Sequence, residues 1–113
     1  MANYEKTMRG NFDEFLHRLD RGILDGSVSA SFEGGSDYRC GAIRCAMRVY
    51  SRISLVSERA CVSIMLIGNG DDLFLSVITS GGNKDVFYRI NAIGEENFLS
   101  KVVDLVEEYK GEN

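Results

Sequence analysis

Residues 61–80 limit the possible folds more than any other part of the sequence. Residues 61–67 form a strongly apolar run, and residues 73–80 form a second run rich in β-forming side chains. Between the two runs lies Asn69-Gly70, a dipeptide that is among the strongest hairpin signals. A run that is apolar at nearly every position is typical of a strand covered on much of both faces. The segment therefore predicts an antiparallel hairpin with a central strand.

Two amphipathic helices are predicted on either side of the β-rich region. Asn11 can cap the first helix, and Glu14 stands at the capping-box position three residues later. Its apolar residues recur at helical spacing and are Phe12, Phe15, Leu16, Leu19 and Ile23. The second helix begins at Gly94, and Glu95 and Glu96 suit the positive end of its dipole. It has a broad apolar face, which comprises Phe98, Leu99, Val102, Val103, Leu105, Val106 and Tyr109.

The remaining segments predict further strands and turns. Residues 3–9 alternate weakly, as a short edge strand does, and residues 27–33 alternate strictly. Residues 34–37, with the sequence Gly-Gly-Ser-Asp, have the composition of a turn. Residues 81–83 predict another turn, which leads into a strand at residues 86–91.

Residues 42–55 fit either a helix or a strand. In a helix, Arg44, Arg48 and Arg52 would stack at intervals of four. In a strand, the same arginines point outward with Ala46 and Tyr50. The inward side chains are then Ile43, Cys45, Met47, Val49, Ile53 and Leu55. The strand is favoured, because residues 49–54 are rich in β-formers and the alternation is nearly unbroken.

These elements predict one α+β domain that spans residues 1–113, a length typical of a single domain. The expected architecture is a two-layer sandwich. An antiparallel meander sheet of about five strands carries the N-terminal and the C-terminal helix on one face. The opposite face is expected to present Ser29, Ser31, Arg44, Arg48, Tyr50 and Arg52. Because a second, partly apolar face needs cover, we expect a symmetric homodimer.

Charge and composition exclude several classes of protein. The net charge is −4; residues 1–60 carry a net charge of +1 and residues 61–113 a net charge of −5. A duplex-binding protein usually has a larger basic excess, so nucleic acid is not an expected partner. No apolar run approaches the ~20 residues of a membrane span, and the first residues do not resemble a signal peptide. We therefore expect a cytoplasmic protein without a membrane partner.

The three cysteines, Cys40, Cys45 and Cys61, are expected to be reduced thiols in such a compartment. Zinc usually takes four ligands, two of them from a short Cys-x2–4-Cys motif, and this chain offers only one such pair. His17 is the only histidine and falls on the first predicted helix, far along the sequence from the cysteines. No metal or cofactor is therefore expected.

Three segments of the sequence resemble a family of short bacterial proteins known only as a domain of unknown function. These segments are residues 11–16, residues 75–83 and residues 91–99, which hold mainly turn and cap sequences. The resemblance covers nearly the whole chain and implies a bacterial, cytoplasmic, single-domain protein. It implies no catalytic residue. A second resemblance, to the helix-grip fold of small ligand-binding proteins, concerns architecture alone.

The arginines at residues 44–52 are the most unusual candidate for a binding site. Arg44, Arg48 and Arg52, with Tyr50 between them, can form a stripe that holds an anionic ligand or an acidic partner. The competing interpretation is that they pair with Glu33, Asp37 or Glu58 on neighbouring strands. Exposed arginines usually serve such pairing, so the second interpretation is favoured.

Other polar groups have simpler explanations than a functional site. Residues 80–84 form a glycine-rich turn with one lysine but lack the spacing of a phosphate loop. Asp71-Asp72 and Glu95-Glu96 do not have the spacing of a calcium loop. His17 has only helix-surface charges as neighbours, so no nucleophile–base pair is evident. The sequence favours a non-enzymatic binding or interaction module; the alternative is a helix-grip-like carrier of a small apolar or anionic ligand.

Overall fold

The computed structural model describes residues 2–25, 30–53, 59–81 and 95–109, which form a five-stranded antiparallel sheet and two helices. The strand order in the sheet is β1-β5-β4-β3-β2, so four consecutive strands form a meander and the first strand lies beside the last. The elements are β1 (Ala2–Arg9), α1 (Phe12–Asp25), β2 (Ser31–Cys40), β3 (Ile43–Ile53), β4 (Arg59–Asn69), β5 (Asp72–Gly81) and α3 (Glu95–Glu108).

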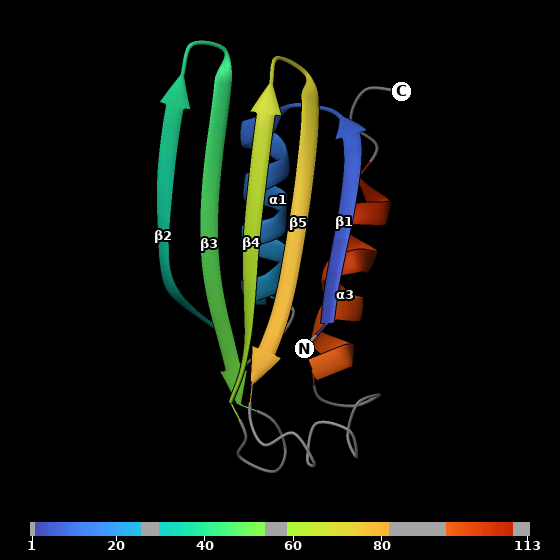
Figure 1. The fold of residues 1–113 in the computed structure, drawn as a ribbon. Coiled ribbons are helices and arrows are strands. Elements are labelled where there is room, and N and C mark those ends of the chain that lie inside the picture. Colours follow the sequence, from blue (N-terminus) through green and yellow to red (C-terminus); the bar gives the residue numbers. More distant parts are fainter. Residues whose placement is uncertain (1, 26–29, 54–58, 82–94, 110–113) are drawn as a thin grey trace.

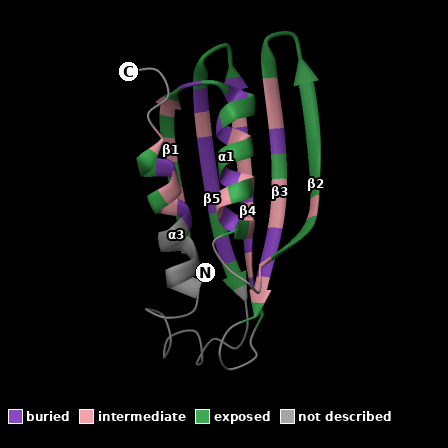
Figure 2. Ribbon diagram, turned by 180° about the vertical axis from the view of Figure 1, so that it is seen from behind, coloured by how far each residue is buried: buried purple, intermediate pink, exposed green. Residues whose placement is uncertain are grey.

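Both helices cover the same face of the sheet, as predicted. In Figure 1 the strands lie in front of α1 and α3, so that neither of these two helices lies on the viewer's side. From behind, α1 runs along the middle of the sheet in front of β4 and α3 lies beside β1, while β2 extends past the helix layer (Figure 2). The α+β two-layer architecture is therefore confirmed. In the described parts of the chain, neither helix has the length and apolar character to cross a membrane.

The core lies between the helices and the strands β3, β4 and β5. It is built from alternate strand positions and from the helical stripe expected for α1. Its buried side chains are Phe12, Phe15, Leu19, Ile23, Ala46, Tyr50, Ala60, Val62, Ile64, Leu66, Leu73, Leu75, Val77, Val102 and Val106. Packing is close enough that a Cβ added to Gly68 would lie 2.7 Å from a ring carbon of Phe12.

The start of α1 is capped by both local and distant groups. The side-chain oxygen of Asn11 accepts a hydrogen bond from the backbone N–H of Glu14 at 2.9 Å, as predicted. The Glu14 side chain does not reach back to Asn11 directly. Instead, the Tyr109 hydroxyl accepts from the Asn11 N–H at 3.1 Å and donates to Glu14 Oε1 at 2.9 Å. The residue after α3 thus completes the cap of α1.

The predicted hairpin of β4 and β5 is confirmed, and Gly70 takes a φ of 63° in its turn. The expected strand at residues 42–55 is also confirmed, as β3, and the helical alternative is excluded. Three predictions fall on residues that the structure does not describe. They are the first part of the predicted strand at 27–33 (residues 27–29), Leu55 of the predicted inward set, and the predicted strand at 86–91, which lies within residues 82–94.

The turn predicted at residues 34–37 is wrong. These residues belong to β2, and the register shifts between Phe32 and Gly34, so Glu33 sits in a bulge. The chain turns later, at Gly41, where φ is 60°. The glycines at 34 and 35 are tolerated because β2 is an edge strand with mostly exposed residues.

The orientation predicted for β3 is inverted. Its register pairs Ala46 with Leu66 and Tyr50 with Val62, all of which are buried beneath the helices. Because alternate residues share a face, Arg44, Arg48 and Arg52 also lie on the helix side rather than on the opposite face. Arginine is accommodated there because its apolar stem can lie along the sheet while its head reaches a partner at the rim, on α1 for Arg44 and on β2 for Arg48.

Candidate functional site

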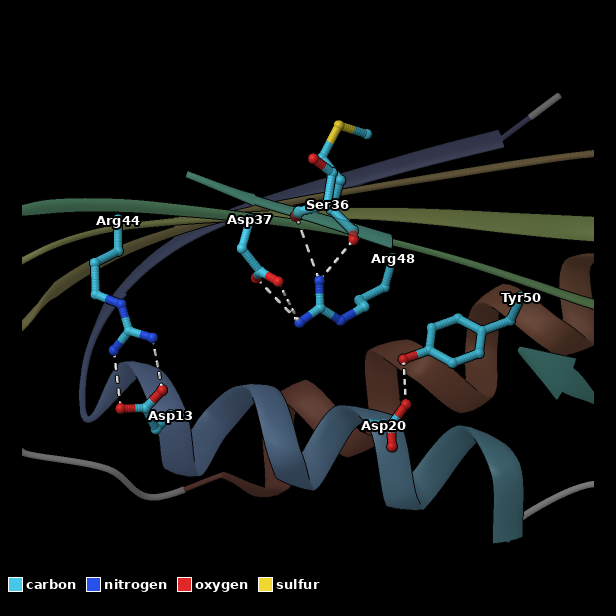
Figure 3. Close-up of polar contacts among 8 residues, drawn as sticks. Asp13, Asp20, Ser36, Asp37, Arg44, Arg48 and Tyr50 are labelled. Atoms are coloured by element: carbon cyan, nitrogen blue, oxygen red, sulfur yellow. Dashed lines mark hydrogen bonds and ion pairs between the residues drawn. The ribbon is translucent and has the colours of Figure 1, made fainter. Parts of the chain in front are cut away.

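The predicted arginine site lies on the helix side of the sheet, beside α1, and three of its residues, Arg44, Arg48 and Tyr50, are already paired (Figure 3). Arg44 makes a two-pronged contact with Asp13 on α1, with both N–H···O distances at 2.8 Å. Its guanidinium also stacks 4.3 Å from the centre of the Phe12 ring. The hydrogen bond from Arg44 holds the pKa of the Asp13 carboxyl below its usual value. Arg44 therefore ties β3 to the first turn of α1.

Arg48 is held by the neighbouring strand β2. Its Nη2 donates to Asp37 Oδ1 at 3.1 Å, and its Nη1 donates to the backbone carbonyls of Met47 at 2.8 Å and Ser36 at 3.4 Å. Only 19% of the side chain is exposed. Pairing of Arg48 with Asp37 confirms the competing interpretation for this residue, and an anion would have to displace these contacts.

Tyr50 is a buried anchor rather than a surface residue. Its side chain is 1% exposed, and its hydroxyl donates to Asp20 Oδ1 at 2.7 Å. Burial, with the Asp20 carboxylate as a second cause, raises the pKa of Tyr50. Arg52, further along β3, is half-buried, and burial lowers its pKa. The four predicted site residues thus share one face of β3, where Arg44 and Tyr50 bind α1 and Arg48 binds β2.

A groove lies between α1 and the strands β2 and β3. Its volume is about 470 Å³, within the range of small-molecule sites. Apolar side chains from both sides meet there, among them Phe32, which is 51% exposed. The lining residues are Asp13, Leu16, His17, Asp20, Leu24, Phe32 and Arg48. His17 lies on the exposed rim of this groove, as expected for a helix-surface residue.

The opposite side of the sheet carries the side chains of β3 that were predicted to point into the core. We call this surface the open face; it is the face of the sheet away from α1 and α3. Its apolar residues are Tyr38, Cys40, Ile43, Cys45, Met47, Val49, Ile53, Cys61, Met65, Ile67, Phe74 and Ile78. Cross-strand pairing joins them into rows, such as Tyr38–Cys45–Ile67–Phe74 across four strands.

Five large apolar side chains of the open face are strongly exposed. Their exposed fractions run from 41% for Met47 and 43% for Ile78 to 66% for Tyr38, with Ile43 and Ile53 between. Single exposed apolar residues are ordinary, but a contiguous apolar sheet face is a mark of an interaction surface. The sequence signal for this surface is the composition of β4, which has apolar side chains on both of its faces and not on the helix side alone.

A polar cluster closes one end of the open face. Glu33 accepts hydrogen bonds from Arg59 at 2.7 Å, from Ser31 at 3.3 Å and from Ser51. The hydrogen bond from Ser51, followed by that from Arg59, lowers the pKa of Glu33. Glu33 was expected to be a partner for the arginines of β3, but it binds Arg59 of β4 instead. This cluster joins the bulge of β2 to the ends of β3 and β4.

The described residues contain no group of three or more histidine, cysteine or acidic side chains that could hold a metal ion. Asp72 pairs with Arg9 at 3.1 Å, and the side chains of Glu95 and Glu96 lie outside the described set. Cys45 and Cys61 are half-buried thiols within β3 and β4, and Cys40 is exposed at the end of β2.

Comparison with known proteins identifies the family without assigning an activity. A search of curated proteins found no match to the chain. A family model does match, and it covers residues 1–110, which include every strand and both helices described above. The chain therefore belongs to a family of unknown function, DUF6054.

Proposed function

We propose that this protein is a non-enzymatic interaction module that binds a protein partner through the open face of its sheet. The exposure of five large apolar side chains on that single face carries the proposal. Isolated soluble domains rarely leave so continuous an apolar surface in water. The helices protect the other face, so the two sides of the sheet have different roles.

The proposal includes a bacterial, cytoplasmic setting. Support for the location comes from the thiols of Cys40, Cys45 and Cys61, which are all free. Free cysteines, all three of them on strands of the sheet, suit a reducing compartment. Origin in bacteria follows from the resemblance described for the sequence.

Site-specific photo-crosslinking in cells that produce the chain tests the proposal. A photo-reactive side chain replaces Met47 on the open face and, in a matched control, Phe32 on the helix side, which is similarly exposed. We expect a covalent protein adduct from position 47 and none from position 32. If both variants are folded and position 47 yields no adduct, the open face does not bind a protein.

The groove beside α1 supports a second candidate function, that of a carrier for a small apolar ligand. Leu16, Leu24 and Phe32 supply an apolar wall, and the volume of about 470 Å³ suits such a ligand. An anionic ligand is less favoured, because Arg44 and Arg48 already bind Asp13 and Asp37. Native mass spectrometry of freshly purified protein distinguishes the two functions: a stoichiometric small-molecule adduct supports the carrier, whereas a clean apo mass counts against it.

A further inference from the structure

We infer that the partner of the open face is a second copy of this chain, packed face to face about a twofold axis. This inference rests on the proposed function, since it names the occupant of the same surface. Three features of the sheet carry it: its size, the distribution of its charges and the position of its central strand.

The size of the open face matches that of a stable interface. Five strands spaced by ~4.8 Å give a width of about 24 Å, and strands of this length extend for about 30 Å. The face therefore offers on the order of 700 Å², close to the ~800 Å² per partner of a standard interface. Packing of two such sheets at ~10 Å would bury the exposed apolar rows of both copies.

The charges of the open face suit a copy of itself. Within the described residues, the face carries charged side chains at the ends of the strands and at the β1 edge, and its centre is apolar or weakly polar. At one end Arg9 pairs with Asp72 at 3.1 Å, and at the other Arg59 pairs with Glu33 at 2.7 Å. Each end is thus balanced within one chain.

Arginines on the open face would repel the same arginines of a twofold-related copy, but the arginines of β3 do not lie on that face. Arg44 and Arg48 lie on the helix side, where they bind Asp13 and Asp37. At the β1 edge, Glu5 accepts a hydrogen bond from Ser76 at 3.4 Å. An apolar centre with a polar rim is the usual anatomy of a protein interface.

The strand order places β4 at the middle of the sheet. A twofold axis through that middle brings β4 against β4 of the second copy, with Met65 next to the axis. Met65 pairs across the sheet with Met47, so the centre of the interface holds two methionines from each chain. Their flexible side chains can fill the space between two identical surfaces.

Sedimentation equilibrium of the full chain at micromolar concentration tests the inference. We expect a mass of twice 12.6 kDa for the unsubstituted protein. Met47→Lys places a charge in the apolar centre and should weaken dimerisation at least about tenfold, which corresponds to ~1.4 kcal/mol. Phe32→Lys, the matched helix-side control, should keep the dimer. A mass of 12.6 kDa at every concentration overturns the inference.

Thiol labelling provides a second readout, which uses the unsubstituted protein and so does not depend on whether a variant folds. Cys45 and Cys61 are half-buried on the open face, so the dimer should protect them from a maleimide. Their labelling rates should rise when the unsubstituted protein is diluted below the dimer dissociation constant. Rates that do not change with concentration overturn the inference.

The crosslink from position 47 separates failure of this inference from failure of the proposed function. An adduct of twice the chain mass supports the second copy. An adduct of any other mass, together with monomeric sedimentation, overturns the second copy while the open face remains a protein-binding surface. With no adduct at all, both are refuted.

Discussion

Replacement of Tyr50 by phenylalanine measures how strongly the sheet is tied to α1. The substitution removes one oxygen, which donates at 2.7 Å to Asp20 from a side chain that is 1% exposed. A hydrogen bond to a charged group contributes ~1.5–3 kcal/mol, and partial solvation of Asp20 places this one near the lower end. We expect Tyr50→Phe to lower the free energy of unfolding by about 1.5 kcal/mol and Tm by about 6 °C.

Urea unfolding followed by far-ultraviolet circular dichroism is the appropriate assay, because the chain has no tryptophan. Tyr38→Phe is the matched control, since the Tyr38 side chain is 66% exposed. If Tyr50→Phe is no less stable than this control, the contact with Asp20 is not a stabilising one.

The pH dependence of stability gives an independent check on Tyr50. Its pKa in the folded protein is raised above 10.0, so the folded state keeps this proton when the unfolded state loses it. The stabilisation is therefore fully present below pH 10 and is lost as the pH rises above that value. Above pH 10, the stability of Tyr50→Phe should fall less steeply than that of the unsubstituted protein; equal slopes would contradict the assignment.

Substitutions at Gly68, Gly41 and Asp13 test other contacts. Gly68→Ala should cost about 1–3 kcal/mol in urea unfolding, because the new Cβ would lie 2.7 Å from the Phe12 ring, and Phe12→Leu should recover part of the loss. Gly41→Ala should lower the free energy of unfolding by about 1 kcal/mol, because φ of residue 41 is 60°, and Gly41→Asn should lower it less. Equal stability of the unsubstituted protein and both variants would contradict the left-handed conformation of Gly41. Asp13 has a lowered pKa, so its stabilising contact with Arg44 is present above pH 3.8 and is lost as the pH falls below it. Acid titration by circular dichroism should therefore be shallower in Asp13→Asn, and an unchanged titration would show that the ion pair adds no stability.

The features that the sequence predicts correctly are those whose structural signal is local. The cap of α1 depends on Asn11 and Glu14, which are three residues apart, and the turn between β4 and β5 depends on Gly70 and its neighbours. The helical spacing of Phe15 and Leu19 likewise identifies the buried side of α1 without any distant contact. These features follow from short-range geometry, so a single sequence contains enough information.

The orientation of β3 depended on distant contacts and could not be read locally. Alternation in a strand defines two faces but does not say which of them the helices will cover. Here the face of β3 that packs against α1 is the one whose side chains bind α1. Arg44 binds Asp13 and Tyr50 binds Asp20, across 31 and 30 residues of sequence. Charged side chains on one face suggested solvent, whereas the structure directs them to partners on α1 and β2. Arg44, Arg48, Tyr50 and Arg52 therefore share one face of β3, but it is the helix side and not the predicted opposite side.

The cap of α1 has a consequence for how the chain acquires its structure during synthesis. The Tyr109 hydroxyl that links Asn11 and Glu14 comes 98 and 95 residues after them, and within the described residues β1 pairs only with β5. At ribosomal speeds near 10 residues per second, the first helix waits about 10 s for the side chain that completes its cap. The N-terminal strand and helix therefore lack these contacts until residues 72–109 have been made. The domain is closed by its last-made helix, so its tertiary structure should form in one late, cooperative step after the ribosome has finished α3.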